Sequence, residues 1–141
     1  MEDDILEKIY KKYKGLREKA DSDCKFDKSC MEDSFSTTNN KIWWINQKSE
    51  WQRVYRSFEL QRKEKYKALY EFYYKDFPLK LNSKEEYSLY IESDPSYTNI
   101  YTVCLVVKEI LLYIDSVLDI LNSRQWEIKN YLQWLAFSNG Q

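Results

Sequence analysis

The final third of the chain carries its most regular hydrophobic pattern. Apolar residues recur in alternating steps of three and four from Ile100 to Leu121, and the pattern resumes at Ile128, Tyr131 and Leu135. This heptad spacing is typical of a helix that packs lengthwise against another helix. A second apolar register makes the face wider than one partner helix covers; its members are Cys104, Leu111, Leu118 and Leu132. Two arrangements fit this pattern: a buried core helix, and a helix that assembles with copies of itself.

Two more helices are predicted upstream. Residues 1–20 repeat apolar side chains every three or four positions among charged ones, and residues 41–76 contain neither Gly nor Pro. Pro78 should end the second helix, because proline lacks a backbone donor and disfavours the helical conformation in the residue before it. We therefore expect one domain, with an N-terminal helix and connection over residues 1–40 and a helical core over residues 41–141.

A short alternating segment separates the last two helices. Leu79 to Leu81 and Tyr87 to Ile91 alternate apolar and polar residues around a polar stretch, which predicts a small β-hairpin near residues 79–91. The sequence Ser93-Asp94-Pro95-Ser96 predicts a turn that starts the final helix. The expected fold class is therefore mostly α, built from long helices with this one hairpin.

Residues that could support catalysis are scarce. The chain has no histidine, and Cys24, Cys30 and Cys104 match neither a CxxC zinc spacing nor an even disulfide framework. We expect all three thiols to be reduced, and we expect no catalytic residues, no metal and no cofactor. Trp43 and Trp44 favour core or subunit packing over a ligand site. These observations argue against an enzyme.

Membrane segments and export signals are not expected either. The N-terminus is acidic where a signal peptide would be basic, and no apolar stretch of about 18 residues is free of charge. The cytoplasm is the expected compartment.

The distribution of charge is more informative than the net charge of −1. Residues 1–33 carry a net charge of −2, residues 34–75 a net charge of +5, and residues 76–141 a net charge of −4. At helical spacing, one face of the central helix collects cations and rings that we call the basic stripe: Arg53, Arg56, Lys63, Lys67, Tyr70 and Tyr74. Single-stranded nucleic acid needs this combination, because phosphates attract cations and unpaired bases stack on rings. Alternatively, the lysines and arginines only solvate the outer face of the helix.

Two segments resemble the UvsY recombination mediator family of T-even-type phages. The stronger resemblance is residues 112–140, LYIDSVLDILNSRQWEIKNYLQWLAFSNG, where apolar periodicity combines with fixed polar positions. The second is Lys67-Ala68-Leu69-Tyr70-Glu71-Phe72-Tyr73, which is similar to the family's DNA-binding motif of Lys, Ala, Arg, Leu, acid, Tyr, Tyr. Leu69 stands where that motif has its second cation, and we infer that Arg62, Lys63 and Lys65 compensate. The resemblance covers roughly residues 34–140.

The resemblance implies a function and a set of partners. Such a mediator binds single-stranded DNA, contacts the phage recombinase and the phage single-strand-binding protein, and acts in the cytoplasm of the infected bacterial host. It also forms a ring-like homo-oligomer through C-terminal helices. The residues expected to bind DNA are Arg53, Arg56, Arg62, Lys63, Lys65, Lys67, Tyr70, Tyr73 and Tyr74. The residues expected to pack between subunits are Ile110, Ile114, Val117, Leu121, Ile128 and Leu135.

Two hypotheses therefore follow from the sequence. The first is a recombination mediator that loads a phage recombinase onto strand coated by single-strand-binding protein. The second is a helical oligomeric scaffold or adaptor protein without DNA binding, whose basic face is solvated or meets an acidic protein. Affinity for single-stranded DNA at physiological salt separates them.

Overall fold

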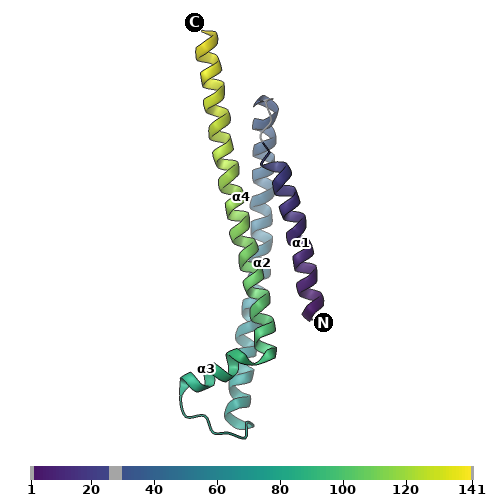
Figure 1. The fold of residues 1–141 in the computed structure, drawn as a ribbon, viewed down its shortest axis with the longest axis vertical. Helices are drawn as coiled ribbons and strands as arrows, with labels where there is room; N and C mark the ends of the chain where they lie inside the picture. The colour runs from purple at the N-terminus through teal and green to yellow at the C-terminus, as the bar shows by residue number, and fades with distance from the viewer. Residues whose placement is uncertain (1, 26–29, 141) are drawn as a thin grey trace.

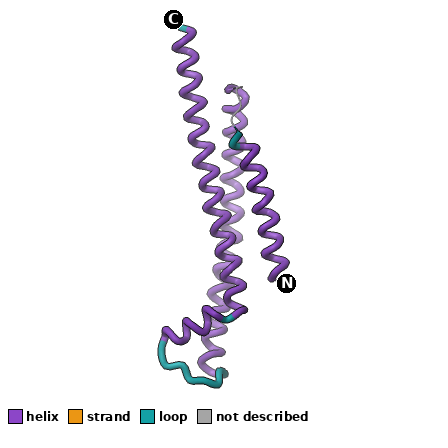
Figure 2. The backbone as a smooth tube through the Cα atoms, viewed as in Figure 1, coloured by secondary structure: helices purple, strands orange, loops and turns teal. Residues whose placement is uncertain are grey.

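A computed structural model describes residues 2–25 and 30–140 of the chain, with side chains for residues 3–25 and 36–140. It contains four helices: α1 (Glu2–Asp23), α2 (Cys30–Lys75), α3 (Lys84–Ser93) and α4 (Pro95–Asn139). The described part of the chain contains no strand (Figure 2). The predicted mostly α fold of long helices is therefore confirmed. Helix α2 begins at Cys30, so the expected boundary after residue 40 falls inside this helix.

Helices α2 and α4 form a long antiparallel pair that organises the molecule (Figure 1). Helix α1 lies beside this pair and contacts α4 as well as α2, whereas α3 lies across the end where α2 finishes and α4 begins. The C-terminal part of α4 extends past the start of α2 (Figure 1). Most of the chain thus depends on one lengthwise contact between two helices.

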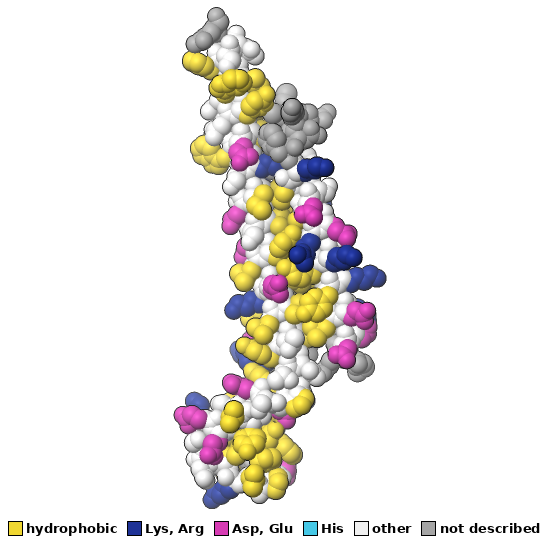
Figure 3. All heavy atoms as spheres, in the orientation of Figure 1, with side chains coloured by type: hydrophobic (Ala, Val, Ile, Leu, Met, Phe, Trp, Pro, Cys, Tyr) yellow, Lys and Arg dark blue, Asp and Glu magenta, His cyan; other side chains and the backbone are white. Residues whose placement is uncertain are grey.

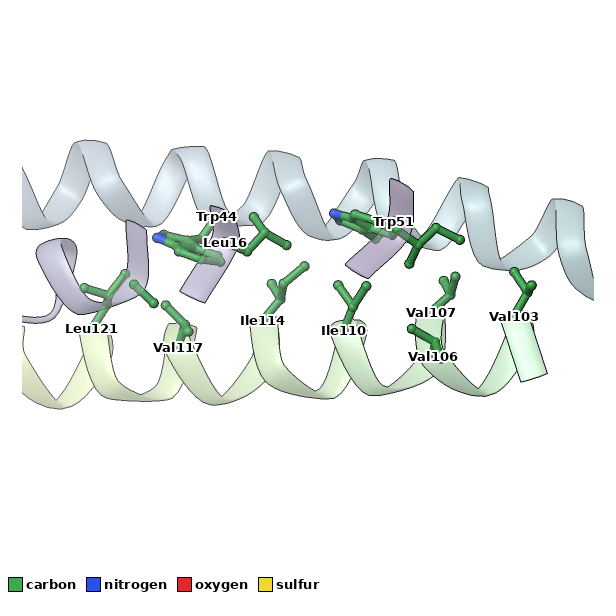
Figure 4. Packing of buried hydrophobic residues seen from close by; sticks show 12 residues of the cluster. Leu16, Trp44, Trp51, Val103, Val106, Val107, Ile110, Ile114, Val117 and Leu121 are labelled. Carbon is green, nitrogen blue, oxygen red and sulfur yellow. The ribbon is translucent and has the colours of Figure 1, made fainter. Parts of the chain in front are cut away.

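The heptad pattern of α4 forms the centre of this contact. Trp44 of α2 lies opposite Val117 of α4, and Trp51 lies opposite Ile110 (Figure 4). Leu16 of α1 packs between the two tryptophans. Every position of the heptad pattern from Val103 to Leu121 is buried, and Ile100, where the pattern starts, is half-buried. Burial of such side chains contributes about 1.5–3 kcal/mol each to folding. The predicted helix-packing face of α4 is confirmed, and its partners are α2 and α1 of the same chain.

This packing places most of the predicted inter-subunit residues inside one subunit. Ile110, Ile114 and Leu121 have no exposed surface, and Val117 and Ile128 retain only 2%. Burial of these side chains therefore needs no second copy of the chain. Leu135 is half-buried. The exposed apolar surface of α4 consists of other residues, described below with the candidate site.

The predicted β-hairpin near residues 79–91 is wrong, because residues 84–93 form helix α3. Ser83 caps the helix by accepting a hydrogen bond from the backbone N–H of Glu86 at 3.2 Å, while the Glu86 carboxylate accepts one from the Asn82 backbone N–H at 2.7 Å. This reciprocal arrangement is a variant of the capping box, which stabilises a helix start. The sequence Ser-Lys-Glu-Glu is thus a helix signal that outweighs the alternating pattern after it.

The predicted end of α2 and the predicted start of α4 are confirmed. Helix α2 ends at Lys75, three residues before Pro78. Helix α4 begins at Pro95 with Asp94 as its N-cap, whose side chain accepts hydrogen bonds from the backbone N–H and the hydroxyl of Ser96 at 3.0 and 2.6 Å. Proline suits the first helical position because its missing N–H would be unpaired there in any case.

The polar break in the heptad pattern ties α4 to the end of α1. Arg124 is buried, and its guanidinium donates a hydrogen bond of 2.5 Å to the backbone carbonyl of Asp23. The Asp23 carboxylate in turn accepts a hydrogen bond of 3.0 Å from the indole N–H of Trp44. Trp44, expected to pack either in the core or between subunits, is fully buried within the subunit. These polar contacts fix the position of α1 against both long helices.

Two of the three thiols can be described. Cys24 and Cys104 are free cysteines, as predicted. The side chain of Cys30 lies outside the described residues. No helix in residues 2–25 or 30–140 combines the length and the apolar character that crossing a bilayer requires.

Gly15 is the one glycine within α1, and its backbone does not require a glycine. No described residue has a positive φ, and a Cβ added at Gly15 would meet no atom within 4 Å. Because glycine weakens a helix interior relative to alanine, Gly15→Ala should raise the free energy of unfolding by about 0.5–1 kcal/mol. Urea unfolding should show a higher midpoint with an unchanged slope. An unchanged or lower midpoint would contradict the conclusion that a Cβ at position 15 meets no neighbouring atom.

Candidate nucleic-acid interface

The basic stripe lies on the outer surface of α2. All six of its side chains are exposed, whereas Trp51 and Phe58 face the core, as their spacing predicts. Lys63, Lys67, Tyr70 and Tyr74 follow one another at steps of three or four residues, so each lies about one helical turn from the next on this face. The structure therefore gathers four cations and two rings along one solvent-facing track.

The cations of the stripe are available to a ligand. Lys63 and Lys67 form no ion pair with any residue in the described part of the chain. Arg56 makes a hydrogen bond of 3.3 Å to the backbone carbonyl of Gln52, which uses only one of its donors. Charged groups that are exposed and unpaired keep their full attraction for phosphate oxygens.

The two rings of the stripe stand parallel to each other. The Tyr70 and Tyr74 rings are 6.4 Å apart between centroids and inclined by only 7°, and 67% of Tyr74 is exposed. Tyr87 of α3 packs against Tyr70 with a centroid distance of 5.0 Å and an interplanar angle of 35°, which restricts the motion of the Tyr70 ring. A ring that is exposed and held in place suits base stacking, because little conformational freedom is lost on binding.

Arg62 faces α4 and not the stripe. Its guanidinium donates to both oxygens of Glu59, at 3.1 and 2.9 Å, and to the hydroxyl of Tyr97 at 2.8 Å. The hydrogen bonds to Glu59 and then to Tyr97 raise the pKa of Arg62, and the bond to Arg62 lowers the pKa of Glu59. These contacts use the side chain to join α2 to α4, so Arg62 is not on the exposed track.

A second group of polar residues joins α2 to the start of α4. Tyr73 is only 9% exposed, and its hydroxyl donates a hydrogen bond of 2.9 Å to Asp94. Hydrogen bonding to Ser96 lowers the pKa of Asp94, and the bond from Tyr73 and the positive charge of Lys65 add to this shift. Tyr73 is therefore a packing residue at this junction, and its ring is not open to a base. Lys65 is half-buried near the same carboxylate.

The thiol next to Arg62 has no special reactivity. Burial, and secondarily the negative charge of Glu59, raise the pKa of Cys104 to about 11, so the thiol stays protonated at neutral pH. Within residues 2–25 and 30–140, no group of three or more Cys, Asp or Glu side chains could hold a metal ion.

The C-terminal end of α4 presents a second exposed surface, which we call the α4 tip. It is apolar and aromatic, and hydrophobic side chains gather there and near α3 (Figure 3). Its residues are Trp126, Tyr131, Leu132, Trp134 and Phe137. Exposed apolar patches of this kind mark interaction sites.

The family model described as "Recombination, repair and ssDNA binding protein UvsY" matches residues 19–141. The chain belongs to the UvsY family. Its first 18 residues, which form most of α1, lie outside the matched range. A comparison with curated protein sequences finds no match.

Solved structures with the same fold include crystal structures of the bacteriophage T4 recombination mediator protein UvsY. The structure in lattice type IV has a TM-score of 0.80 at 20% identity and covers 89% of this chain and 98% of its own. The lattice type II structure has a TM-score of 0.81 at 20% identity and covers 89% of this chain and 96% of its own. The lattice type I structure has a TM-score of 0.80 at 21% identity and covers 88% of this chain and 98% of its own. The UvsY-family chain thus shares its helical architecture with T4 UvsY.

Sequence reasoning missed two rings of this UvsY-family protein, Tyr87 beside the stripe and Tyr101 beside Arg62. Tyr87 was assigned to a strand, although the capping sequence from Ser83 to Glu86 could have placed it on a helix. Tyr101 is exposed, stacks on Tyr97 at 5.9 Å and lies under the guanidinium of Arg62. The i, i+4 spacing of Tyr97 and Tyr101 on α4 could have indicated their stacking, whereas no local signal indicates the contact with Arg62 of α2.

We predict that Asp94→Ala destabilises the protein by about 1 kcal/mol at neutral pH, because it removes the N-cap of α4. The pKa of Asp94 is lowered in the folded state. Its stabilising contribution is therefore present above its ordinary pKa of about 3.9 and is lost as the pH falls through the folded value. The difference in free energy of unfolding between wild type and variant, measured by urea unfolding, should shrink below about pH 4.

A matched control is Asp119→Ala, which removes an exposed carboxylate from the same helix. It should change the free energy of unfolding by no more than about 0.5 kcal/mol. Equal effects of the two substitutions would show that the contacts of Asp94 do not stabilise the junction.

Proposed function

We propose that this UvsY-family protein is a recombination mediator that binds single-stranded DNA and promotes loading of a phage recombinase onto strand coated by single-strand-binding protein. The observation that carries this proposal is the basic stripe, four exposed cations and two exposed parallel rings on one face of α2. Family membership and the fold shared with T4 UvsY support it. The protein works by binding and assembly, without catalysis, in the cytoplasm of the infected host.

The strand binds along the stripe. Lys63 and Lys67 hold phosphates through charge, which gives no sequence preference. Tyr70 and Tyr74 stack on bases, which contributes about 1–3 kcal/mol per base. The contacts of Arg62 and Tyr73 with α4 and with Asp94 give these two residues a structural role beneath this surface.

Assembly through the α4 tip makes the binding strong. The cations of one stripe alone bind a strand weakly, and salt weakens this binding further. A ring-like homo-oligomer repeats the stripe, and multivalency then raises the apparent affinity by about a hundredfold or more. The aromatic side chains of the tip are exposed in the single chain and become buried between copies.

The double substitution Lys63→Glu and Lys67→Glu should weaken binding to a single-stranded oligonucleotide without changing the size of the oligomer. Each lost phosphate contact should reduce the slope of log affinity against log salt by about 0.7. Fluorescence anisotropy at several salt concentrations measures both effects.

The matched control is Lys11→Glu with Lys14→Glu, which makes the same change of charge on exposed residues of α1. It should reduce affinity far less than the substitutions in the stripe. Unchanged affinity of the Lys63 and Lys67 variant would remove the stripe from the mechanism and would favour the scaffold or adaptor function without DNA binding.

Replacing Trp134 and Phe137 with Ser should produce a smaller species in analytical sedimentation, because both side chains are exposed on the α4 tip. The apparent affinity for a long oligonucleotide should fall by about a hundredfold as multivalency is lost. Helix content should stay unchanged, since neither residue is buried in the subunit. Leu89→Ser, an exposed apolar position on α3, is the control and should leave the size intact. Unchanged size of the double variant would place the subunit contact elsewhere.

A further inference from the structure

A small hollow lies between α2 and α4, and the proposed function does not use it. Its volume is about 270 Å³, which accommodates one planar ring such as a nucleobase. Glu59 and Arg62 line it from α2, and Tyr101 and Lys108 line it from α4. Of the three charged side chains that line the hollow, two are positive, so its net charge has the sign that attracts a strand.

The hollow adjoins the basic stripe on the surface of α2. Glu59, at its edge, stands three residues after Arg56 and four before Lys63, which is the spacing of neighbours on a helix surface. Hydrogen bonding to Arg62 lowers the pKa of Glu59, and the nearby positive charge of Lys63 adds to this shift. A strand on the stripe therefore passes the edge of the hollow.

Tyr101 presents a ring at the hollow that is both exposed and held in place. Its exposed fraction is 43%, and its ring lies nearly parallel to that of Tyr97, with centroids 5.9 Å apart and planes inclined by 11°. The guanidinium carbon of Arg62 lies 5.9 Å from the centre of the same ring. Tyr70 and Tyr74 of the stripe have the same arrangement, 6.4 Å apart and inclined by 7°. A restrained ring loses little conformational freedom when a base stacks on it.

The two ring pairs flank the lysines of the stripe. Tyr70 stands eight residues after Arg62, which corresponds to about 12 Å along α2 at about 1.5 Å per residue. Lys63 and Lys67 lie between these two levels. A strand of a few nucleotides thus meets rings at both ends and cations between them, the combination that binds unpaired bases and their phosphates.

Lys108 adds a cation beyond Tyr101. It follows Tyr101 by seven residues, two turns along the same face of α4, and its side chain is exposed. Lys108 forms no ion pair with any residue that the structure describes. Its charge is therefore available to a phosphate.

The acidic residues of α4 on either side of Lys108 contact other helices. Glu109 forms a hydrogen bond with Tyr13 of α1, where burial, and secondarily the charge of Glu109, raise the pKa of the Tyr13 hydroxyl. Asp115 pairs with Lys48 of α2 at 2.7 Å. Within the hollow, Glu59 is paired with Arg62 at 2.9 Å. These contacts offset the negative charges nearest to Lys108.

The hollow suits a base better than an acidic side chain of a partner protein. Arg62 already donates hydrogen bonds to both oxygens of Glu59 and to the hydroxyl of Tyr97, so few of its donors remain for another carboxylate. The groups that remain exposed are a ring and, two turns away, a cation. This arrangement repeats the chemistry of the stripe.

We propose that Tyr101 and Lys108 extend the DNA-binding surface from α2 onto α4, where Tyr101 stacks on a base at the hollow and Lys108 binds a phosphate. Arg62 is a positioning residue in this arrangement, because it contacts the Tyr101 ring while its hydrogen bonds to Glu59 and Tyr97 hold it in place. The inference rests on the proposed function, since it concerns the strand that the stripe binds.

The test measures binding of a labelled single-stranded oligonucleotide to the full chain by fluorescence anisotropy at several salt concentrations. Tyr101→Leu removes the ring and should weaken affinity by about fivefold or more at every salt concentration, because stacking does not depend on counterions. Tyr101→Phe keeps the ring and should bind like wild type. Lys108→Gln should lower the slope of log affinity against log salt by about 0.7, because one phosphate contact is lost.

Matched controls make the same substitutions on α1. Tyr10→Leu removes a ring that is 52% exposed, and Lys11→Gln removes an exposed cation. Both should leave the affinity and its salt dependence unchanged. Helix content and oligomer size of Tyr101→Leu should equal those of Tyr101→Phe, since the exposed ring is not part of the buried core.

The outcomes separate this extension from DNA binding by the stripe. Suppose that Lys63→Glu with Lys67→Glu loses affinity as expected. Unchanged affinity of Tyr101→Leu, or an unchanged salt slope of Lys108→Gln, would then overturn the extension and leave the proposed function intact. An equal loss in Tyr101→Phe would contradict stacking, and a smaller oligomer for Tyr101→Leu would assign the ring to a subunit contact. No oligonucleotide binding by wild type would overturn both proposals.

Discussion

The antiparallel packing of α2 against α4 is the interaction on which the rest of the structure depends. Trp44 and Trp51 meet the heptad face of α4 over several turns, and α1 closes the same core through Leu16. Neither long helix could bury an apolar face of this length alone, and a pair of helices without tertiary packing would be marginal in water. One continuous contact therefore fixes which side of α2 faces the core and which side faces solvent.

That orientation divides the polar residues of α2 into two groups with different roles. Arg62 and Tyr73 turn toward the rest of the subunit and join α2 to Tyr97 and Asp94. The six residues of the basic stripe turn outward and are exposed to solvent. The same sequence segment thus contributes both to stability and to the candidate binding surface, and the packing of α4 decides the role of each residue.

Much of this architecture follows from local sequence signals. The heptad spacing, Pro78 and the Asp94-Pro95 cap predict the long helices and their ends, and helical periodicity alone predicts the exposed face that carries Lys63 and Lys67. The partner of the heptad face could not be predicted, because the same spacing suits a helix of another copy. The structural roles of Arg62 and Tyr73 were also missed, since their partners lie 35 and 21 residues away in sequence. The predicted hairpin was wrong because the cap formed by Ser83 and Glu86 stabilises the start of a helix.

Photocrosslinking tests most directly whether the outer face of α2 is the DNA-binding surface. A single-stranded oligonucleotide that carries a photoreactive thymine analogue is irradiated with the assembled protein, and the crosslinked peptides are mapped by mass spectrometry. We expect crosslinks at Tyr70 and Tyr74, the two exposed parallel rings, and none at Tyr73, which lies between them in sequence but is buried against Asp94. Crosslinks at Tyr73, or only on α1 or α4, would contradict the orientation of α2 and the binding surface assigned to it.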